Sequence, residues 1–304
     1  MSKIAFLFPG QGAQAVGMCK ELDQELPAVR ALFDRANEVL GFDLRTLCFE
    51  GPADALEATD ISQPAIFVAS LAALESLKAS QPAVVEACQG AAGLSLGEYT
   101  ALVFAGAMDF AAGLEVVRRR GQAMQAASLA TRSGMTSVLG LDEAKVDELC
   151  QRVTPHGRLW KANMLGPGNI AVSGDAAALD AVEPIAAELG AMKAVRLAVA
   201  GAFHTPIMKP ADEQLAEVLA RTDIHPPRIP VYSNVTAAPH SSDPEVIART
   251  LATQVTQSVR WEESMRRMLA EGFDAFYEIG PGRVLTALLK RINRKASCTP
   301  IPAR

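Results

Sequence analysis

The sequence predicts an α/β protein in which a large domain with a parallel sheet is interrupted by a smaller domain. Short apolar runs bounded by glycine and proline, such as Ile4 to Phe8, are typical of buried parallel strands. Longer stretches with apolar residues at helical spacing, such as Ile61 to Leu77, lie between these runs. From about residue 130 to residue 197 the pattern changes to short strands and helices in close succession, which predicts a separate small domain.

The composition agrees with an enzyme-sized globular protein. A chain of 304 residues can bury a full core, in one large domain or in two of ordinary size. Its 49% hydrophobic and 21% charged residues exclude a disordered or fibrous chain. The net charge of −5 argues against nucleic acid as a partner, because proteins that bind it usually carry a basic excess.

The cysteines and the N-terminus bear on metals and on location. The five cysteines are scattered, without a Cys-x-x-Cys pair or a histidine at metal-ligand spacing, so we expect reduced thiols and no metal site. The first apolar run ends at Pro9 and is too short for the core of a signal peptide. No apolar stretch approaches the roughly twenty residues of a membrane span. We therefore expect a cytoplasmic protein without a membrane partner, or an organellar one if a transit peptide has been removed.

The large domain is predicted to begin with alternating strands and helices. In chain order these are a strand at Ile4 to Phe8, helices at Leu22 to Leu40 and Ile61 to Leu77, a strand at Ala87 to Leu94, and helices at Glu98 to Gly106 and Gly113 to Met124. Pro64 is expected near the first turn of its helix, where a missing N–H does no harm.

The middle of the chain predicts strand, helix, strand, strand, helix, strand. These elements are Met135 to Leu141, Asp142 to Val153 with an Asp cap, Leu159 to Met164, Ile170 to Ser173, Asp175 to Leu189 and Lys193 to Leu197. This βαββαβ order is the ferredoxin-like arrangement. We predict a small domain at residues 130–197, inserted into a large domain of residues 1–129 and 198–304.

The large domain is predicted to resume with a helix after Pro206. The elements that follow are a strand at Ile229 to Ser233, helices around residues 245–253 and 260–271, a strand at Ala275 to Ile279, and a helix after Gly280-Pro281-Gly282.

A candidate nucleophile stands between the predicted strand and helix in Gly93-Leu94-Ser95-Leu96-Gly97. A serine on such a sharp turn is lifted out of the sheet, and glycines let the neighbouring backbones pass without a Cβ clash. The N-terminus of the next helix can then stabilise an oxyanion. The five-residue pattern alone arises by chance in roughly one chain in ten of this length, so its placement carries the argument.

A serine nucleophile needs a base, and the chain has only four histidines. His156, His225 and His240 lie in polar or proline-containing loops, where an ordinary capped or exposed histidine is the simpler interpretation. His204 differs because it lies in an apolar loop just before a helix. No aspartate stands in an obvious third position between Ser95 and His204 outside the small domain, so a hydrolase-type Ser, Asp, His order is not supported.

Two further features have both a structural and a functional interpretation. Arg118, Arg119 and Arg120 lie on one predicted helix, where successive residues point about 100° apart, so at most one or two of them face a site. Gln11 is either a turn residue or part of a site, because open α/β sheets bind ligands at the carboxyl ends of their strands.

Together these segments resemble the malonyl-CoA:acyl carrier protein transacylases of fatty acid synthesis and the related acyltransferase domains of polyketide synthases. The resemblance runs nearly end to end, and several separated motifs in order are far more specific than any one. They are Phe8-Pro9-Gly10-Gln11-Gly12-Ala13-Gln14, Gly93-x-Ser95-Leu96-Gly97-Glu98-Tyr99, Arg120-Gly121, Gly201-Ala202-Phe203-His204, Gln254 seven residues before Trp261, and Glu278-Ile279-Gly280-Pro281-Gly282.

The resemblance implies a hydrolase-like large domain with a ferredoxin-like insert, and it implies a role for each site residue. These roles are the acylated nucleophile for Ser95, the general base for His204, the oxyanion hole for the N–H groups of Gln11 and Leu96, binding of the malonyl carboxylate for Arg120, and positioning of the His204 and Arg120 region for Gln254. In this family backbone groups orient the histidine, which explains the missing aspartate. Phe203 before His204 looks like the malonyl-selecting form of the family's specificity motif.

One residue departs from the family pattern. The common elbow is Gly-His-Ser-x-Gly, whereas Leu94 occupies the position of that histidine here. Because His204 remains as the base, we expect activity to survive and only the tuning by that neighbour to be lost.

The implied activity is that of an acyl-carrier-protein S-malonyltransferase that works without a cofactor or metal, with malonyl-CoA and an acyl carrier protein as partners. The family leans toward monomers. Because carrier proteins are acidic, the basic residues Lys290, Arg291, Arg294 and Lys295 are candidates for a docking rim, and a solvated helix end explains them equally well.

Two rival enzymatic interpretations remain open from the sequence, and a non-enzymatic scaffold is the least favoured. A serine esterase or thioesterase would share Ser95 and His204 and release free acid quickly. An acyltransferase that serves a polyketide, polyunsaturated-lipid or malonate-decarboxylase carrier would use the same chemistry. A non-enzymatic scaffold would not require the serine, the histidine and the arginine together.

Overall fold

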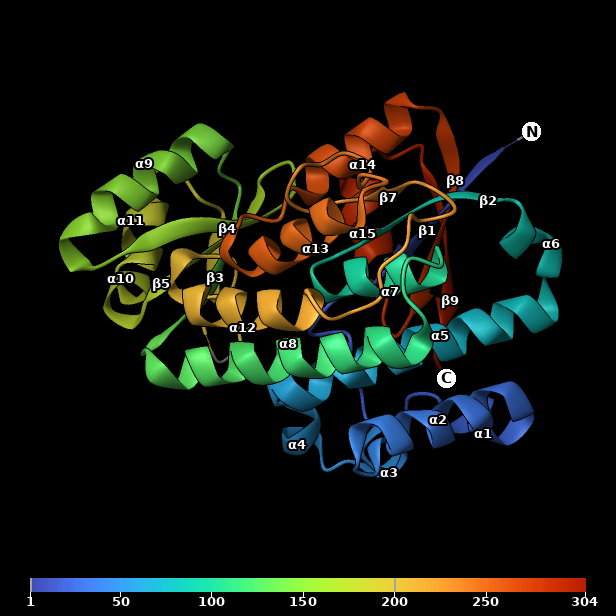
Figure 1. Ribbon diagram of the computed structural model, residues 1–304. Coiled ribbons are helices and arrows are strands. Elements are labelled where there is room, and N and C mark those ends of the chain that lie inside the picture. The colour runs from blue at the N-terminus through green and yellow to red at the C-terminus, as the bar shows by residue number, and fades with distance from the viewer. Residues whose placement is uncertain (1, 200) are drawn as a thin grey trace.

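Five parallel strands form the larger of two sheets in the computed structural model, which describes residues 2–199 and 201–304 (Figure 1). The order is β7-β2-β1-β8-β9, with β1 Lys3–Phe8, β2 Cys88–Gly93, β7 Val231–Tyr232, β8 Phe273–Gly280 and β9 Ser297–Pro302. Strand β1 is central and carries core residues on both faces. Phe6 and Phe8 pack in one hydrophobic cluster, and Ala5 and Leu7 pack in another. A strand buried on both faces explains the continuous apolar run in the sequence.

Two long helices pack against each other beside the larger sheet (Figure 1). They are α5 Thr59–Ser80 and α8 Phe110–Ala130. A Cβ on Gly121 of α8 would lie 2.9 Å from the Cα of Asp60, so glycine allows the two backbones to approach closely. Helix α5 is buried along most of its length, which explains its lack of a polar face.

The other helices of the larger part complete its layers. They are α1 Lys20–Glu25, α2 Pro27–Leu40, α3 Leu44–Glu50, α4 Ala53–Glu57, α6 Pro82–Glu86, α7 Leu96–Phe104, α12 Lys209–Leu219, α13 Pro244–Thr253, α14 Trp261–Ala270 and α15 Val284–Ile292. Within the described ranges, no helix combines the length and apolarity that crossing a bilayer requires.

The smaller sheet is antiparallel, with strand order β4-β5-β3-β6. Its strands are β3 Ser133–Leu139, β4 Leu159–Gly166, β5 Asn169–Asp175 and β6 Lys193–Arg196, and the helices packed against them are α9 Glu143–Val153, α10 Ala176–Asp180 and α11 Val182–Glu188. This unit has its own hydrophobic core. The predicted fold class, a parallel-sheet α/β protein with a βαββαβ insert, is confirmed. The domain boundaries at residues 130 and 197 stay a prediction.

Several predicted elements differ from the structure for identifiable reasons. The helix predicted at Leu22 to Leu40 is divided at Leu26, whose φ of −116° and ψ of 110° are extended, because a residue before proline disfavours the helical region. The helix predicted at Asp175 to Leu189 is divided at Ala181. Pro184 has no N–H for the Asp180 carbonyl, which weakens a continuous helix there. Pro64 lies inside α5, which begins at Thr59, two residues earlier than the predicted start at Ile61.

Strand β9 and helices α3, α4 and α6 were missing from the prediction. β9 lies at the edge of the sheet beside β8 and contains Pro300 and Pro302. Prolines remove ladder donors and are tolerated in strands mainly at an edge, so the pattern of a buried strand is absent there.

Candidate active site

Ser95 lies on a strained turn between β2 and α7, with φ of 50° and ψ of −101°. The flanking glycines make this turn possible. A Cβ on Gly93 would lie 1.9 Å from the carbonyl carbon of Gly97, and a Cβ on Gly97 would lie 2.0 Å from the Phe8 carbonyl oxygen. No larger residue fits either position without moving backbone. The Gly-x-Ser-x-Gly spacing therefore reflects close packing of β1, β2 and α7 around the serine.

His204 reaches the Ser95 hydroxyl although 109 residues separate the two in the chain. Its Nε2 lies 2.8 Å from the Ser95 Oγ, and its Nδ1 lies 2.9 Å from the carbonyl oxygen of Gln254. Since a carbonyl only accepts, Nδ1 carries the hydrogen in the neutral ring and Nε2 is free to accept the serine proton. A backbone carbonyl thus does the orienting that an aspartate does in a Ser-His-Asp triad.

The ionisation of His204 suits a base. Burial, together with the positive charge of Arg120, lowers its pKa from 6.5 to about 4. The neutral ring therefore predominates at pH 7 and can take up a proton.

Arg120 is the one arginine of its run that faces the site. Its side chain is fully buried, and its Nη2 lies 2.9 Å from both the Ser95 Oγ and the Gln254 Oε1. Arg118 and Arg119 instead pair with Glu115 nearer the surface, as the helical geometry predicts for neighbours about 100° apart.

The charge of Arg120 is not paired directly. Among the described residues, no carboxylate lies within 4 Å of its guanidinium, and its Nε has no hydrogen-bond partner. Its Nη1 donates to the Gln63 Oε1 at 2.5 Å, and the Tyr99 ring lies 5.2 Å from its Cζ. Burial lowers the pKa of Arg120, and the nearby Tyr99 and Glu98 oppose this effect. A buried cation with spare donors is suited to bind an anionic group.

Gln11 and Leu96 carry main-chain N–H groups in two loops that meet next to the serine. Gln11 follows β1, and Leu96 is the first residue of α7. Their loops touch, since a Cβ on Gly10 would lie 2.4 Å from the Leu94 carbonyl oxygen. Within residues 2–199 and 201–304, neither N–H donates to another main-chain group. A cavity of about 230 Å³ lined in part by Gln11 and Val199 lies beside this loop.

The remaining predicted residues, Gln254 and Phe203, are buried next to His204. Gln254 forms hydrogen bonds with His204, Arg120, the Ser95 carbonyl and Glu98. Phe203 is 5% exposed and packs in the large hydrophobic core.

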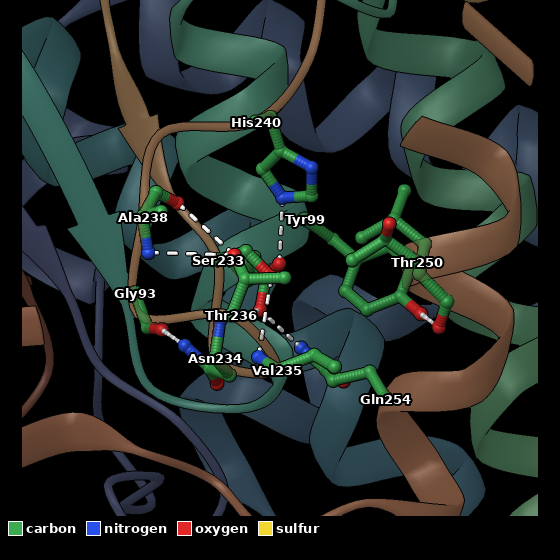
Figure 2. Close-up of polar contacts among 12 residues, drawn as sticks. Gly93, Tyr99, Ser233, Asn234, Val235, Thr236, Ala238, His240, Thr250 and Gln254 are labelled. Atoms are coloured by element: carbon green, nitrogen blue, oxygen red, sulfur yellow. Dashed lines mark hydrogen bonds and ion pairs between the residues drawn. The ribbon is translucent and has the colours of Figure 1, made fainter. Parts of the chain in front are cut away.

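Sequence reasoning missed a buried polar cluster behind the serine, made of Glu98, Asn234 and His240. Figure 2 shows Asn234 and His240 of this cluster together with Gln254. The interpretation of His240 as an exposed histidine was wrong, because its side chain is 1% exposed and its Nε2 lies 2.7 Å from the Glu98 Oε1. A turn after β7 folds back so that the His240 N–H bonds to the Val231 carbonyl. A glutamate within the otherwise apolar start of α7 was the one available signal for this cluster.

Comparison with known proteins agrees with this geometry. Residues 5–302 match the family described as "Acyl transferase domain". The chain is 44% identical to the malonyl CoA-acyl carrier protein transacylase of Bacillus subtilis, over 97% of this chain and 92% of that protein.

Solved structures give the same result. The malonyl CoA-acyl carrier protein transacylase of Coxiella burnetii superposes with a TM-score of 0.94 at 34% identity, covering 99% of this chain and 94% of that one. A malonyl-transacylase solved in complex with its type II polyketide synthase acyl carrier protein gives 0.93 at 36% identity, covering 98% and 96%. The chain therefore belongs to the acyl transferase family, among the malonyl-CoA:acyl carrier protein transacylases.

Proposed function

We propose that this chain transfers the malonyl group of malonyl-CoA to the phosphopantetheine thiol of an acyl carrier protein through an ester on Ser95. The observation that carries the proposal is the buried Arg120 guanidinium, whose Nη2 lies 2.9 Å from the Ser95 Oγ. A malonyl group on Ser95 has its free carboxylate only two bonds beyond the ester carbonyl carbon, so the carboxylate lies within reach of this cation. Membership of the family supports the same activity and its place in fatty acid synthesis.

The site residues fit a ping-pong cycle. The Ser95 Oγ attacks the thioester carbonyl of malonyl-CoA while its proton passes to the His204 Nε2. The N–H groups of Gln11 and Leu96 stabilise the tetrahedral oxyanion. Its collapse breaks the carbon–sulfur bond, and the departing CoA thiolate takes the proton from His204. The carrier's thiol then gives its proton to His204 and attacks the ester, which returns the hydroxyl to Ser95.

The first test is the mass of the intact protein. After mixing with malonyl-CoA, we expect the protein to gain one malonyl group, which peptide mapping should assign to Ser95. Adding the phosphopantetheine-loaded carrier protein should then remove it. Ser95 is the expected site because it combines the elbow with a helix N-terminus behind it.

Two outcomes would contradict this assignment. A label on another residue, or one that persists in Ser95→Ala, would reject Ser95 as the nucleophile. Rapid loss of the group to water in the absence of a carrier would instead indicate a thioesterase.

Phe203 is proposed to restrict space beside the acyl α-carbon, since its buried ring directly precedes His204. Methylmalonyl-CoA should therefore acylate Ser95 more slowly than malonyl-CoA. One methyl group in a tight pocket is worth about 1 to 3 kcal/mol, so we expect a ratio of kcat/KM values of roughly 10 to 200. Competition between the two thioesters, read by mass, gives the ratio directly, and equal labelling would remove Phe203 from selection.

We further propose that the acyl carrier protein docks on the basic residues near the C-terminus. All four candidates are exposed. Arg291 already donates to the carbonyls of Pro167 and Gly168, so Lys290, Arg294 and Lys295 remain for an acidic partner. The relative solved with its carrier protein supports this class of partner. We also propose that the protein is a cytoplasmic monomer. Its small domain is proposed to span residues 130–197.

A further inference from the structure

Glu98 is a fully buried carboxylate that makes no contact with the substrate in the cycle proposed above. It lies in the first turn of α7, three residues after Ser95, and has no exposed surface. One of its oxygens, Oε1, lies 2.7 Å from the His240 Nε2. Since a carboxylate only accepts, the His240 Nε2 carries the hydrogen of this bond. A buried pair of this kind costs desolvation, so its presence behind a catalytic serine calls for a physical explanation.

The second oxygen of Glu98 accepts hydrogen bonds from two residues that are themselves hydrogen-bonded to Ser95. Oε2 accepts from the Asn234 N–H at 3.0 Å and from the Gln254 Nε2 at 2.6 Å. The Asn234 Oδ1 accepts the Ser95 N–H at 2.6 Å, and its Nδ2 donates to the Gly93 carbonyl at 2.8 Å. The Gln254 Nε2 also donates to the Ser95 carbonyl at 2.9 Å. Both main-chain polar groups of the strained serine are thus held by residues that are hydrogen-bonded to Glu98.

Glu98 also determines which way the Gln254 amide points. Because the carboxylate accepts only, it requires the amide nitrogen on its side, and this leaves the Gln254 Oε1 to accept from Arg120 at 2.9 Å. The main-chain carbonyl of the same glutamine holds the His204 Nδ1 at 2.9 Å. Gln254 therefore links Glu98 to His204 and to Arg120. Its Nε2, which donates to Glu98, also donates to the Ser95 carbonyl.

We propose that Glu98 and His240 form a positioning pair for the reaction, a role that rests on the proposed malonyl transfer. His240 fixes the carboxylate, and the carboxylate fixes Asn234 and Gln254, which hold Ser95 and His204 in attacking geometry. Neither member of the pair touches the acyl group. Removing the His240 donor leaves a buried carboxylate oxygen without its partner, and the carboxylate then shifts or takes up water.

The test compares His240→Leu with His240→Gln. Leucine keeps bulk and removes the donor, whereas glutamine places an N–H near the position of Nε2. Single-turnover acylation at saturating malonyl-CoA should be slowed about 10 to 100-fold in His240→Leu, because small misplacements of reacting groups have effects of this size. The concentration of malonyl-CoA at half-saturation should change by less than about twofold. His240→Gln should recover most of the rate.

Acetyl-CoA provides the second readout. Since Ser95 and His204 serve every acyl group, acetylation should be slowed by the same factor as malonylation in His240→Leu. Misfolding of the variant would lower the amplitude of labelling, whereas a positioning defect would lower the rate constant of the molecules that are folded. His225→Leu is the matched control, because His225 pairs with Asp223 on the surface and should not affect the rate. If His240→Leu does not fold, His240→Asn replaces it, since its shorter side chain stops short of Glu98.

The outcomes separate this inference from the function on which it rests. If the wild-type chain is not acylated by malonyl-CoA, the proposed function is wrong. If the wild type is acylated and His240→Leu reacts at the same rate, the positioning role is wrong and the function stands. The positioning role also fails if His240→Gln loses as much rate as His240→Leu, or if malonylation alone is slowed.

Discussion

Replacing His204 by alanine should slow the acylation of Ser95 by malonyl-CoA by about two to four decades, the usual contribution of a positioned general base. The His204 Nε2 lies 2.8 Å from the Ser95 Oγ and has its lone pair toward the hydroxyl, because the Gln254 carbonyl holds the hydrogen on Nδ1. Without the imidazole, the serine proton passes to water or to CoA itself. Single-turnover labelling at pH 7 measures the effect, since a pKa of about 4 keeps His204 neutral there.

The control for this variant is His225→Ala, which removes a histidine whose side chain is 61% exposed. It should acylate like the wild type. The labelling amplitude of His204→Ala at long times should still approach one group per chain, because the nucleophile and the proposed oxyanion hole remain. An unchanged rate constant would remove His204 from proton transfer.

The order of strands and helices could be predicted from the sequence because it depends on local residue patterns. A continuous apolar run that ends in Pro9-Gly10 identifies β1, and small apolar residues before the serine identify β2. The serine turn between β2 and α7 follows from the two glycines. The βαββαβ order of the insert was accessible for the same reason. Strand β9 was not, because an edge strand with two prolines lacks the pattern of a buried one.

Only part of the candidate site could be predicted from the sequence. The residues that were missed are polar residues whose burial depends on the tertiary fold. Ser95, His204 and Arg120 stand in motifs that the family resemblance identifies, and the structure brings their side chains together. His240 and Asn234 stand in a polar loop whose burial depends on how a turn folds back against β7. The polar composition of such a loop predicts that its side chains are exposed. They are buried only because the tertiary fold packs the loop against its neighbours. Their buried partner, Glu98, is a single glutamate on a largely apolar helix, and a single residue produces no periodic pattern in the sequence.

Replacing Arg120 by alanine should change the order of the substrates. The wild-type site places a buried guanidinium next to the Ser95 Oγ, where it can form two parallel hydrogen bonds with the malonyl carboxylate. Breaking such a buried pair by removing one partner costs about 3 to 5 kcal/mol, because the remaining charge stays desolvated. Malonyl transfer should therefore fall by about two to three decades or more. Acetyl transfer should persist or improve, because an acetyl group leaves the wild-type cation unpaired.

The measurement is kcat/KM for malonyl-CoA and acetyl-CoA in the wild type, Arg120→Ala, Arg120→Lys and Arg119→Ala. Arg119→Ala is the matched control, since Arg119 lies next on the same helix, has a side chain 52% exposed and pairs with Glu115 near the surface. Lysine keeps the charge without the planar pair of donors, so Arg120→Lys should recover little of the malonyl rate. The distinctive result is the reversal of the malonyl-to-acetyl ratio, because general damage to Ser95 or His204 lowers both rates together. A folded Arg120→Ala that loses both activities in parallel would make Arg120 a structural residue. The assignment of a carboxylate-bearing substrate would then lose its main physical support.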